Sequence, residues 1–272
     1  MAHALPNYME GYISVNDIEI FYSRFGQTSQ EAPTLLLLHG GWATGQLNWS
    51  SHYTYLCQHF DVISLDWRGH GKTNNPAGKF TGYSRLAWDV IGFCQALKID
   101  KPIIMGHSSG AIISLLISIF DPTLLQRQIL IGIHPFMGIS KSHHKGMRDF
   151  FATADHKVPP KKWRHIFRFP LRSIALWRVH RKTPWFQLLK QSWSMWSAPL
   201  NLSVTDYKKI ICPTLVVMGL RDEFGTLCEA QNFTTLIDTA IVQGVPKADH
   251  MFVMNNPNYL KAHIMNFLVM SF

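Results

Sequence analysis

A serine between two glycines is the first group in this sequence that could do covalent chemistry. Ser108 stands in "GHSSG" (106–110), which fits the pattern G-x-S-x-G. An apolar, strand-like run precedes the pattern and a helix-like run follows it. This is the setting of a nucleophile elbow, a sharp strand-to-helix turn that presents a serine hydroxyl above a sheet. Ser108 is therefore a candidate nucleophile, and the alternative is that these glycines serve an ordinary strand-to-helix bend.

Short apolar runs alternate with helix-like stretches around this serine. Nearly unbroken apolar strands are typical of a sheet covered by helices on both faces, and their alternation with helices predicts a mostly parallel sheet with crossover connections. The predicted strands lie within 18–26, 34–40, 60–69, 101–110, 127–133, 213–222 and 239–250. The predicted helices are 49–59, 83–98, 110–120, 226–237 and 257–270.

The alternation stops between residues 134 and 204, and the charge changes there as well. From Ser140 to Lys190 the chain has thirteen Lys or Arg and two acids, a local net charge of +11, so the formal +9 of the whole chain leaves −2 elsewhere. Five of the nine tryptophans also fall between 134 and 204: Trp163, Trp177, Trp185, Trp193 and Trp196. This segment is therefore interpreted as a basic, Trp-rich insertion over the edge of the sheet.

The bulk composition favours a cytoplasmic globular protein. The 272 residues are 47% hydrophobic and 16% charged, which is enough to bury a full core. The N-terminal residues do not have the pattern of a signal peptide, and the apolar runs are too short to span a bilayer. The four cysteines are scattered without metal-like spacing, so we expect small buried hydrophobes in a reducing compartment.

Five motifs in order make the chain resemble the α/β-hydrolase fold superfamily. They are "HGGW" (39–42), "DWRGHG" (66–71), "GHSSG" (106–110), "GLRD" (219–222) and "ADH" (248–250). The resemblance covers nearly the whole chain except the insertion. It implies an α/β fold with a mostly parallel eight-stranded sheet flanked by helices, a core of 1–133 and 205–272, and a helical cap of 134–204 inserted after the sixth strand. "DWRGHG" is expected to be structural, with Asp66 and Arg68 tying loops together near the site.

The same resemblance supplies partners for Ser108. A serine hydroxyl is a poor nucleophile at neutral pH and needs a base, and the base is expected to be His250. Asp222, at the end of "VVMGLRD", is expected to hold the imidazole of His250 in one tautomer and to stabilise the imidazolium. Glu223 is the rival acid, while Asp249 is disfavoured because it is adjacent to the histidine.

Acyl transfer also requires donors for the developing oxyanion. The resemblance assigns them to the backbone N–H groups of Gly41 and Ser109, with Trp42 as an alternate because the loop "HGGWATGQLNW" could be registered one residue differently. We expect neither a metal nor a cofactor.

These assignments predict a serine hydrolase that cleaves an ester, lactone or thioester through an acyl-enzyme on Ser108. The aromatic cap favours a hydrophobic small-molecule substrate with an apolar or aromatic acyl group. Two further functions stay open: a cofactor-independent dioxygenase of the same fold that cleaves quinolone-type rings, and a hydrolase-derived ligand-binding receptor. In the dioxygenases the acid follows the sixth strand, where this chain has "IGIHPF".

The basic segment 161–182 carries eight Lys or Arg and no acid. It could contact an anionic membrane surface or steer an acidic ligand, and a solvated basic face is the simpler interpretation. No recognised module supports nucleic-acid binding. The sequence does not fix the oligomeric state.

Overall fold

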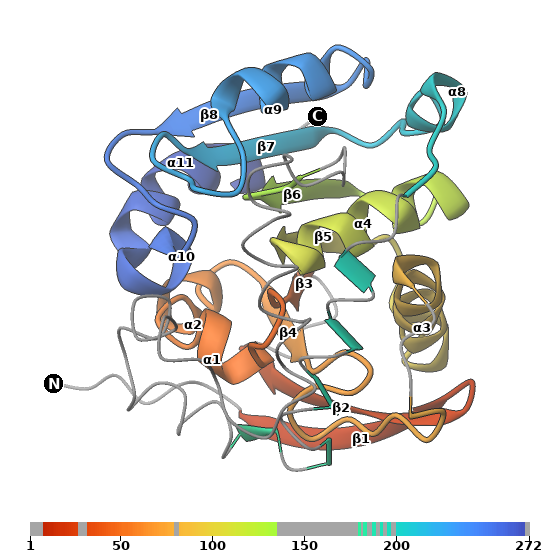
Figure 1. The fold of residues 1–272 in the computed structure, drawn as a ribbon. Coiled ribbons are helices and arrows are strands. Elements are labelled where there is room, and N and C mark those ends of the chain that lie inside the picture. Colours follow the sequence, from red (N-terminus) through yellow and green to blue (C-terminus); the bar gives the residue numbers. More distant parts are fainter. Residues whose placement is uncertain are drawn as a thin grey trace, which may run out of the picture.

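The computed structural model describes residues 8–26, 32–78, 82–134 and 200–269, together with residues 179–180, 182–183, 187–188, 191–192 and 195–196. A single eight-stranded sheet runs through the described part of the chain, with the strand order β1-β2-β4-β3-β5-β6-β7-β8 (Figure 1). β1, β2 and β4 pair antiparallel, and every other neighbouring pair is parallel. The strands are β1 (Met9–Val15), β2 (Ile18–Phe25), β3 (Thr34–Leu38), β4 (Asp61–Leu65), β5 (Ile103–His107), β6 (Arg127–Ile131), β7 (Thr214–Gly219) and β8 (Ala240–Val245).

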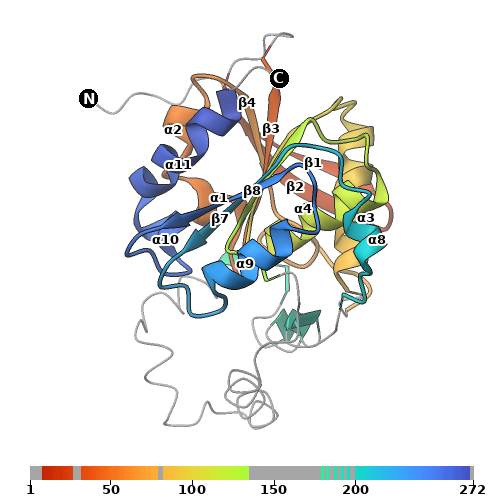
Figure 2. The same cartoon turned by 90° about the horizontal axis from the view of Figure 1, so that it is seen from above.

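Helices cover both faces of this sheet, which is why the central strands are apolar on both sides. Every residue of β4, β5, β6 and β7 is buried. One face carries α1 (Gly45–Trp49), α2 (Tyr53–Leu56), α10 (Phe252–Asn255) and α11 (Pro257–Val269), and the other carries α3 (Tyr83–Ala96), α4 (Ser109–Phe120), α8 (Val204–Tyr207) and α9 (Leu227–Thr234) (Figure 2). The two helical layers enclose two separate apolar clusters, one on each face.

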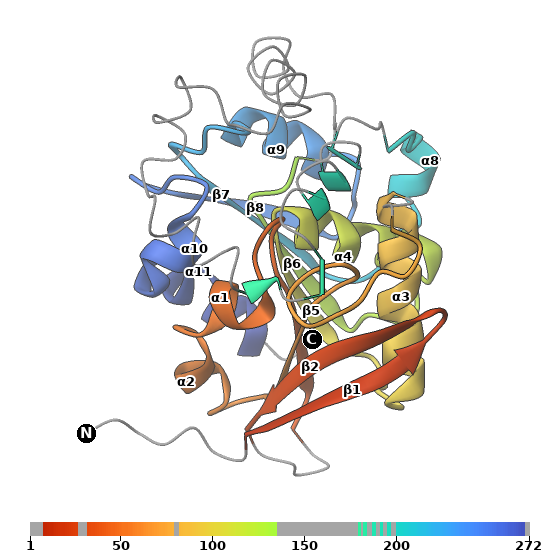
Figure 3. The same cartoon turned by 60° about the horizontal axis from the view of Figure 1, so that its bottom comes forward.

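The β1–β2 hairpin closes one end of the molecule beside α3 (Figure 3). Asn16 takes φ +53° in the turn between the two strands, a conformation that asparagine tolerates better than most residues. The methyl group of Val15 lies where Gly92 of α3 leaves room, because a Cβ at Gly92 would come within 2.6 Å of it. The hairpin is thereby fixed to the helical layer.

The predicted α/β class and the mostly parallel, eight-stranded sheet are confirmed. One predicted helix is wrong: in place of a helix over 49–59, the structure has α1, which ends at Trp49, and the four-residue α2. The first begins earlier because Thr44 caps it, its side chain accepting the N–H of Leu47, and the chain turns through Ser50–Ser51 before the second. Most of segment 134–204, and with it the basic run 161–182, lies outside the described residues, so the helical cap stays a prediction.

The motif "DWRGHG" is structural, as expected. The Arg68 guanidinium, 3% exposed, donates to both carboxylate oxygens of Asp89 and to Asp17. Asp66 accepts the backbone N–H groups of Gly45 and Lys72 and so ties two loops together.

Three of the four cysteines are buried as predicted: Cys57, Cys94 and Cys212. The expectation is wrong for Cys228, which is exposed. It lies on the short helix α9, whose buried residues are Ala230 and Phe233. Among the described helices, none is long and apolar enough to cross a membrane.

Candidate active site

Ser108 occupies a strained turn between β5 and α4. Its φ of +53° and ψ of −115° lie outside the regions that a side-chain-bearing residue usually adopts. Such strain costs about 1–3 kcal/mol and persists only where surrounding contacts enforce it. One of these contacts is the backbone N–H of Ser108, which donates to the carbonyl of Ile131 at the end of β6 at 2.8 Å. The turn has the geometry of a nucleophile elbow.

The two glycines of the motif are required by close backbone packing. A Cβ at Gly106 would lie 2.3 Å from the carbonyl oxygen of Gly110, and a Cβ at Gly110 would lie 2.2 Å from the carbonyl oxygen of Leu38. Real Cβ atoms do not approach backbone atoms this closely. The helix after the serine therefore crosses both β5 and the end of β3 at a distance that only glycine permits.

Asp222 follows β7, and its side chain has no exposed surface. Its Oδ1 accepts the N–H of Phe224 at 2.9 Å, and its Oδ2 lies 2.8 Å from Nδ1 of His250. Burial, the largest single influence, raises the pKa of the Asp222 carboxyl. The hydrogen bond and charge of His250, followed by the Phe224 N–H and then His134, bring that pKa below its ordinary value. Asp222 is thus an ionised acceptor that orients the imidazole of His250.

His250 follows β8 and is 6% exposed. Its main-chain carbonyl accepts a hydrogen bond from Nε2 of His107 at 3.0 Å, which links it to the residue preceding Ser108. Its ring packs against Phe224, with ring centroids 4.6 Å apart. Gly132 directly follows Ile131, whose carbonyl accepts the Ser108 N–H. It leaves space for the His250 ring, because a Cβ at Gly132 would lie 3.1 Å from Nδ1 and Cε1 of that ring. Ser108 and His250 therefore meet the same short segment at the carboxyl end of β6.

The structure distinguishes the rival acids. Glu223 is exposed, and its carboxylate accepts the backbone N–H of His250 at 3.3 Å, away from the imidazole. Asp249 is also exposed. Among the described residues, Asp222 is the carboxylate hydrogen-bonded to the His250 ring.

The expected oxyanion donors lie on two segments beside Ser108: Gly41 is in the loop after β3, and Ser109 is at the start of α4. Ser109 is the first residue of α4, so its N–H has no acceptor within the helix. A Cβ at Gly41 would lie 3.3 Å from the Ser109 hydroxyl, which places the two residues side by side. Trp42 is less suited than Gly41, because its N–H already donates to Nε2 of His70 at 3.2 Å.

His134 was not predicted from the sequence, yet it lies beside the Asp222–His250 pair. Its ring centroid is 5.7 Å from that of His250, and one ligand-type atom of each of the three residues lies within 4.8 Å of the others. Such a group could hold a divalent metal ion, so the expectation of no metal stays a prediction. The only sequence signal for His134 is its position just after a buried strand.

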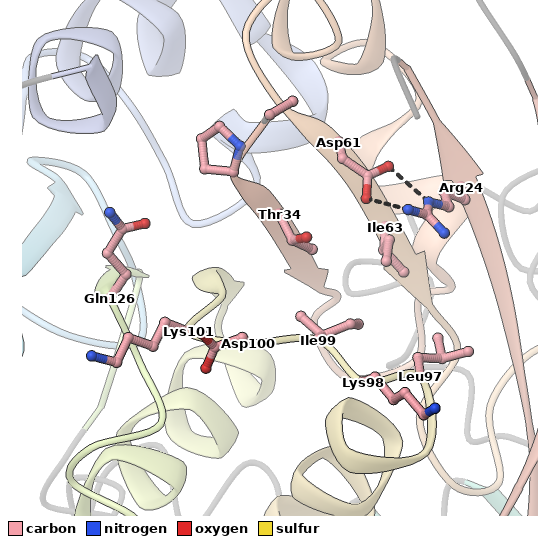
Figure 4. A pocket seen from close by; sticks show the side chains of 12 residues that line it. Arg24, Thr34, Asp61, Ile63, Leu97, Lys98, Ile99, Asp100, Lys101 and Gln126 are labelled. Atoms are coloured by element: carbon pink, nitrogen blue, oxygen red, sulfur yellow. Dashed lines mark hydrogen bonds and ion pairs between the residues drawn. The ribbon is translucent and has the colours of Figure 1, made fainter. Parts of the chain in front are cut away.

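A pocket of about 460 Å³ lies at the amino ends of the parallel strands, opposite to the end where Ser108 lies (Figure 4). Thr34 and Asp61, which begin β3 and β4, line it together with Arg24, and the carboxylate of Asp61 pairs with both ends of the Arg24 guanidinium fork at 2.8 Å. Ser108 follows the carboxyl end of its strand, whereas this pocket lies at amino ends. It is therefore separate from the candidate active site.

The fold and this site define an α/β protein with an elbow serine, a buried acid and a histidine at the carboxyl ends of its strands. A model of the alpha/beta hydrolase family matches residues 35–260. The chain belongs to the alpha/beta hydrolase family.

Relatives of similar length are hydrolases. The 2-hydroxy-6-oxo-6-(2'-aminophenyl)hexa-2,4-dienoic acid hydrolase of Metapseudomonas resinovorans is 24% identical over 96% of this chain and 91% of its own length. The solved structure of 2-hydroxy-6-oxo-6-phenylhexa-2,4-dienoate hydrolase from Rhodococcus sp. strain RHA1 superposes with a TM-score of 0.79 at 17% identity, covering 96% of this chain and 99% of that one.

Shorter matches are more similar in sequence. Karrikin insensitive 2 receptor B of Petunia hybrida is 35% identical over 105 residues, 38% of this chain and 38% of the receptor. The chain spans about two fifths of the length of the curated relatives that it matches above 30% identity.

Proposed function

We propose that this protein is a serine hydrolase that cleaves an ester, lactone or thioester through an acyl-enzyme on Ser108. The observation that carries the proposal is the 2.8 Å hydrogen bond between Nδ1 of His250 and the buried Asp222 carboxylate. This bond leaves Nε2 of His250 as the nitrogen available to take a proton. The strained Ser108 elbow supplies the hydroxyl at the same edge of the sheet.

The reaction then runs in two halves. The Ser108 Oγ attacks the substrate carbonyl while its proton passes to Nε2 of His250, and the Asp222 carboxylate stabilises the imidazolium. The N–H groups of Gly41 and Ser109 stabilise the negative oxygen of the tetrahedral intermediate. His250 returns the proton to the leaving alcohol or thiol, which leaves the acyl group on Ser108. A water that gives its proton to His250 then releases the acid and restores the serine.

The proposal is tested with a panel of p-nitrophenyl esters of increasing acyl length and with a fluorophosphonate label. The parent protein is expected to turn over at least one ester and to take up the label. Ser108→Ala should lose both, whereas Ser51→Ala, at an exposed serine, should retain both. Labelling or turnover that persists in Ser108→Ala overturns the assignment of the nucleophile.

A second candidate is hydrolysis of a carbon–carbon bond next to a ketone. The full-length match to a dienoic acid hydrolase favours it. Loss of the visible absorbance of a 2-hydroxy-6-oxo-6-aryl-hexadienoate, set beside the ester panel, separates the two: faster turnover of the dienoate than of every ester would make the carbon–carbon bond the better assignment.

Dioxygenase activity and a receptor role have less support. A dioxygenase of this fold would have its acid after the sixth strand, where this chain has His134, and the acid paired with His250 follows β7 instead. A receptor would bind a ligand without turning it over. A ligand-induced rise in melting temperature without turnover of any ester or dienoate would favour the receptor.

A further inference from the structure

The main chain of Trp42 is held between two histidines. Its N–H donates to Nε2 of His70 at 3.2 Å, and its carbonyl oxygen lies 3.0 Å from Nε2 of His180. Trp42 adopts φ +60°, which is unfavourable for a bulky residue. Hydrogen bonds at both polar groups of the residue can hold such a conformation. Trp42 directly follows Gly41, so the same contacts restrict the proposed oxyanion loop.

The protonation of His180 follows from its partners. The backbone N–H of Gly71 donates to Nδ1 at 3.0 Å, so that nitrogen carries no proton, and Nε2–H is the donor to the Trp42 carbonyl. His180 is 4% exposed, and burial lowers the pKa of its imidazole despite the opposing effect of the Trp42 carbonyl. A neutral ring thus bridges the loop after β3 to the loop after β4.

A second residue of the same inserted segment reaches the other oxyanion residue. The indole Nε1 of Trp196 donates to the Ser109 hydroxyl at 3.2 Å. Its ring also lies against Gly41, where a Cβ would come within 2.6 Å of Cζ2. The described parts of segment 134–204 therefore touch both sides of the proposed oxyanion hole.

We propose that His180 is a positioning residue for the oxyanion hole: its hydrogen bond to the Trp42 carbonyl fixes the orientation of the adjacent Gly41 N–H. The inference rests on the proposed function. It gives one described residue of the inserted segment a role in catalysis. Oxyanion donors must already be aimed at the developing charge before the reaction starts. If the loop can rotate, the acylation rate therefore falls while the affinity for the substrate in its ground state stays the same.

The decisive test compares two amides at position 180. In His180→Gln the side-chain amide can reach the Trp42 carbonyl as a donor, as Nε2–H does. In His180→Asn the shorter amide can replace only the Nδ1 acceptor for Gly71. We expect Gln to keep the acylation rate within about threefold of the parent. Asn should lower it roughly 10- to 100-fold, somewhat less than the loss of a whole oxyanion donor in other enzymes. The dissociation constant of the substrate, from single-turnover kinetics with the best p-nitrophenyl ester, should be unchanged in both.

The controls separate the possible failures. His59→Asn, at an exposed histidine, should match the parent, and equal melting temperatures for the Gln and Asn variants exclude a general loss of structure. Equal acylation rates for Gln and Asn, or a change confined to substrate binding, overturn the role of His180. An active Ser108→Ala variant would instead overturn the proposed function itself.

Discussion

Nδ1 of His250 lies 2.8 Å from Oδ2 of Asp222, and the side chain of that carboxylate has no exposed surface. A buried anion in this position fixes the tautomer of the imidazole and compensates the positive charge that the imidazole acquires. Asp222→Asn should therefore lower kcat by roughly 10³- to 10⁴-fold with little change in KM, by analogy with serine proteases. Steady-state kinetics on the best ester measure the effect.

Glu223→Gln is the matched control for that variant. The Glu223 carboxylate contacts only the backbone N–H of His250 in the described structure and is exposed. We expect less than about a threefold change in kcat, because an exposed hydrogen bond contributes about 1 kcal/mol or less. A larger loss in Glu223→Gln than in Asp222→Asn would reassign the acid.

The close approach of α4 to the sheet predicts a large cost for a single methyl group. In Gly110→Ala the new Cβ would meet the Leu38 carbonyl oxygen at 2.2 Å, so backbone must move. Overpacking of this kind costs about 1–3 kcal/mol or more of unfolding free energy, and the shift would fall beside His39 and the oxyanion loop. Gly11→Ala is the control, since the three atoms nearest its Cβ would all belong to the Tyr22 side chain, at 3.0–3.1 Å, and not to backbone. The urea midpoint of unfolding and the rate of ester turnover should both fall in Gly110→Ala and should both be unchanged in Gly11→Ala.

Buried neutral histidines predict acid sensitivity. Burial lowers the pKa of His39 and of His107 to about 3, from an ordinary value of 6.5. Between these pH values the unfolded chain binds more protons than the folded protein, so the unfolding free energy must fall as pH falls through this window. The loss is about 1 kcal/mol per histidine per pH unit.

Asp66 opposes part of this loss. Burial raises its pKa to about 6, so between about pH 6 and 4 the folded protein takes up that proton first and gains stability as pH falls. Two histidines outweigh one aspartate, and the net expectation is a falling urea midpoint below about pH 6.5. A midpoint that stays constant down to about pH 4.5 would contradict it.

The buried ion pair of Arg68 and Asp89 gives a further test. Arg68→Met leaves a 1%-exposed carboxylate without its main partner and should cost about 3–5 kcal/mol of unfolding free energy. Replacing both members, as Arg68→Met with Asp89→Leu, should recover part of that loss. Lys208→Met, in an exposed pair with Asp238, should cost less than about 1 kcal/mol. A double variant as unstable as the sum of its single changes would contradict this account.

The central strands were predictable because they are short, largely apolar runs, and several of them end in a chemically recognisable motif. "IIMGH" before Ser108 and "TLVVMG" before Asp222 are both fully buried strands. β1 was not predicted, because it has no continuous apolar run and all of its residues except Val15 are exposed or only partly buried. The acid and the base could be located only through the order of the motifs.

The surroundings of the oxyanion loop could not be predicted. His180 and Trp42 are 138 positions apart, and Trp196 and Ser109 are 87 apart. No local period or propensity encodes such contacts, which depend on how an insertion folds over the sheet. His134 was missed for a similar reason: its partners, Asp222 and His250, lie far along the chain.

The site is assembled from segments that are distant in sequence: His250 is 28 residues beyond Asp222, and Asp222 is 114 residues beyond Ser108. Contacts between such distant segments form late in folding, since long loops must close first. Reactivity of Ser108 toward a fluorophosphonate should therefore report on completed folding. In a refolding experiment it should appear after the helical circular dichroism signal has recovered, which would make the serine a kinetic marker for the last step of assembly.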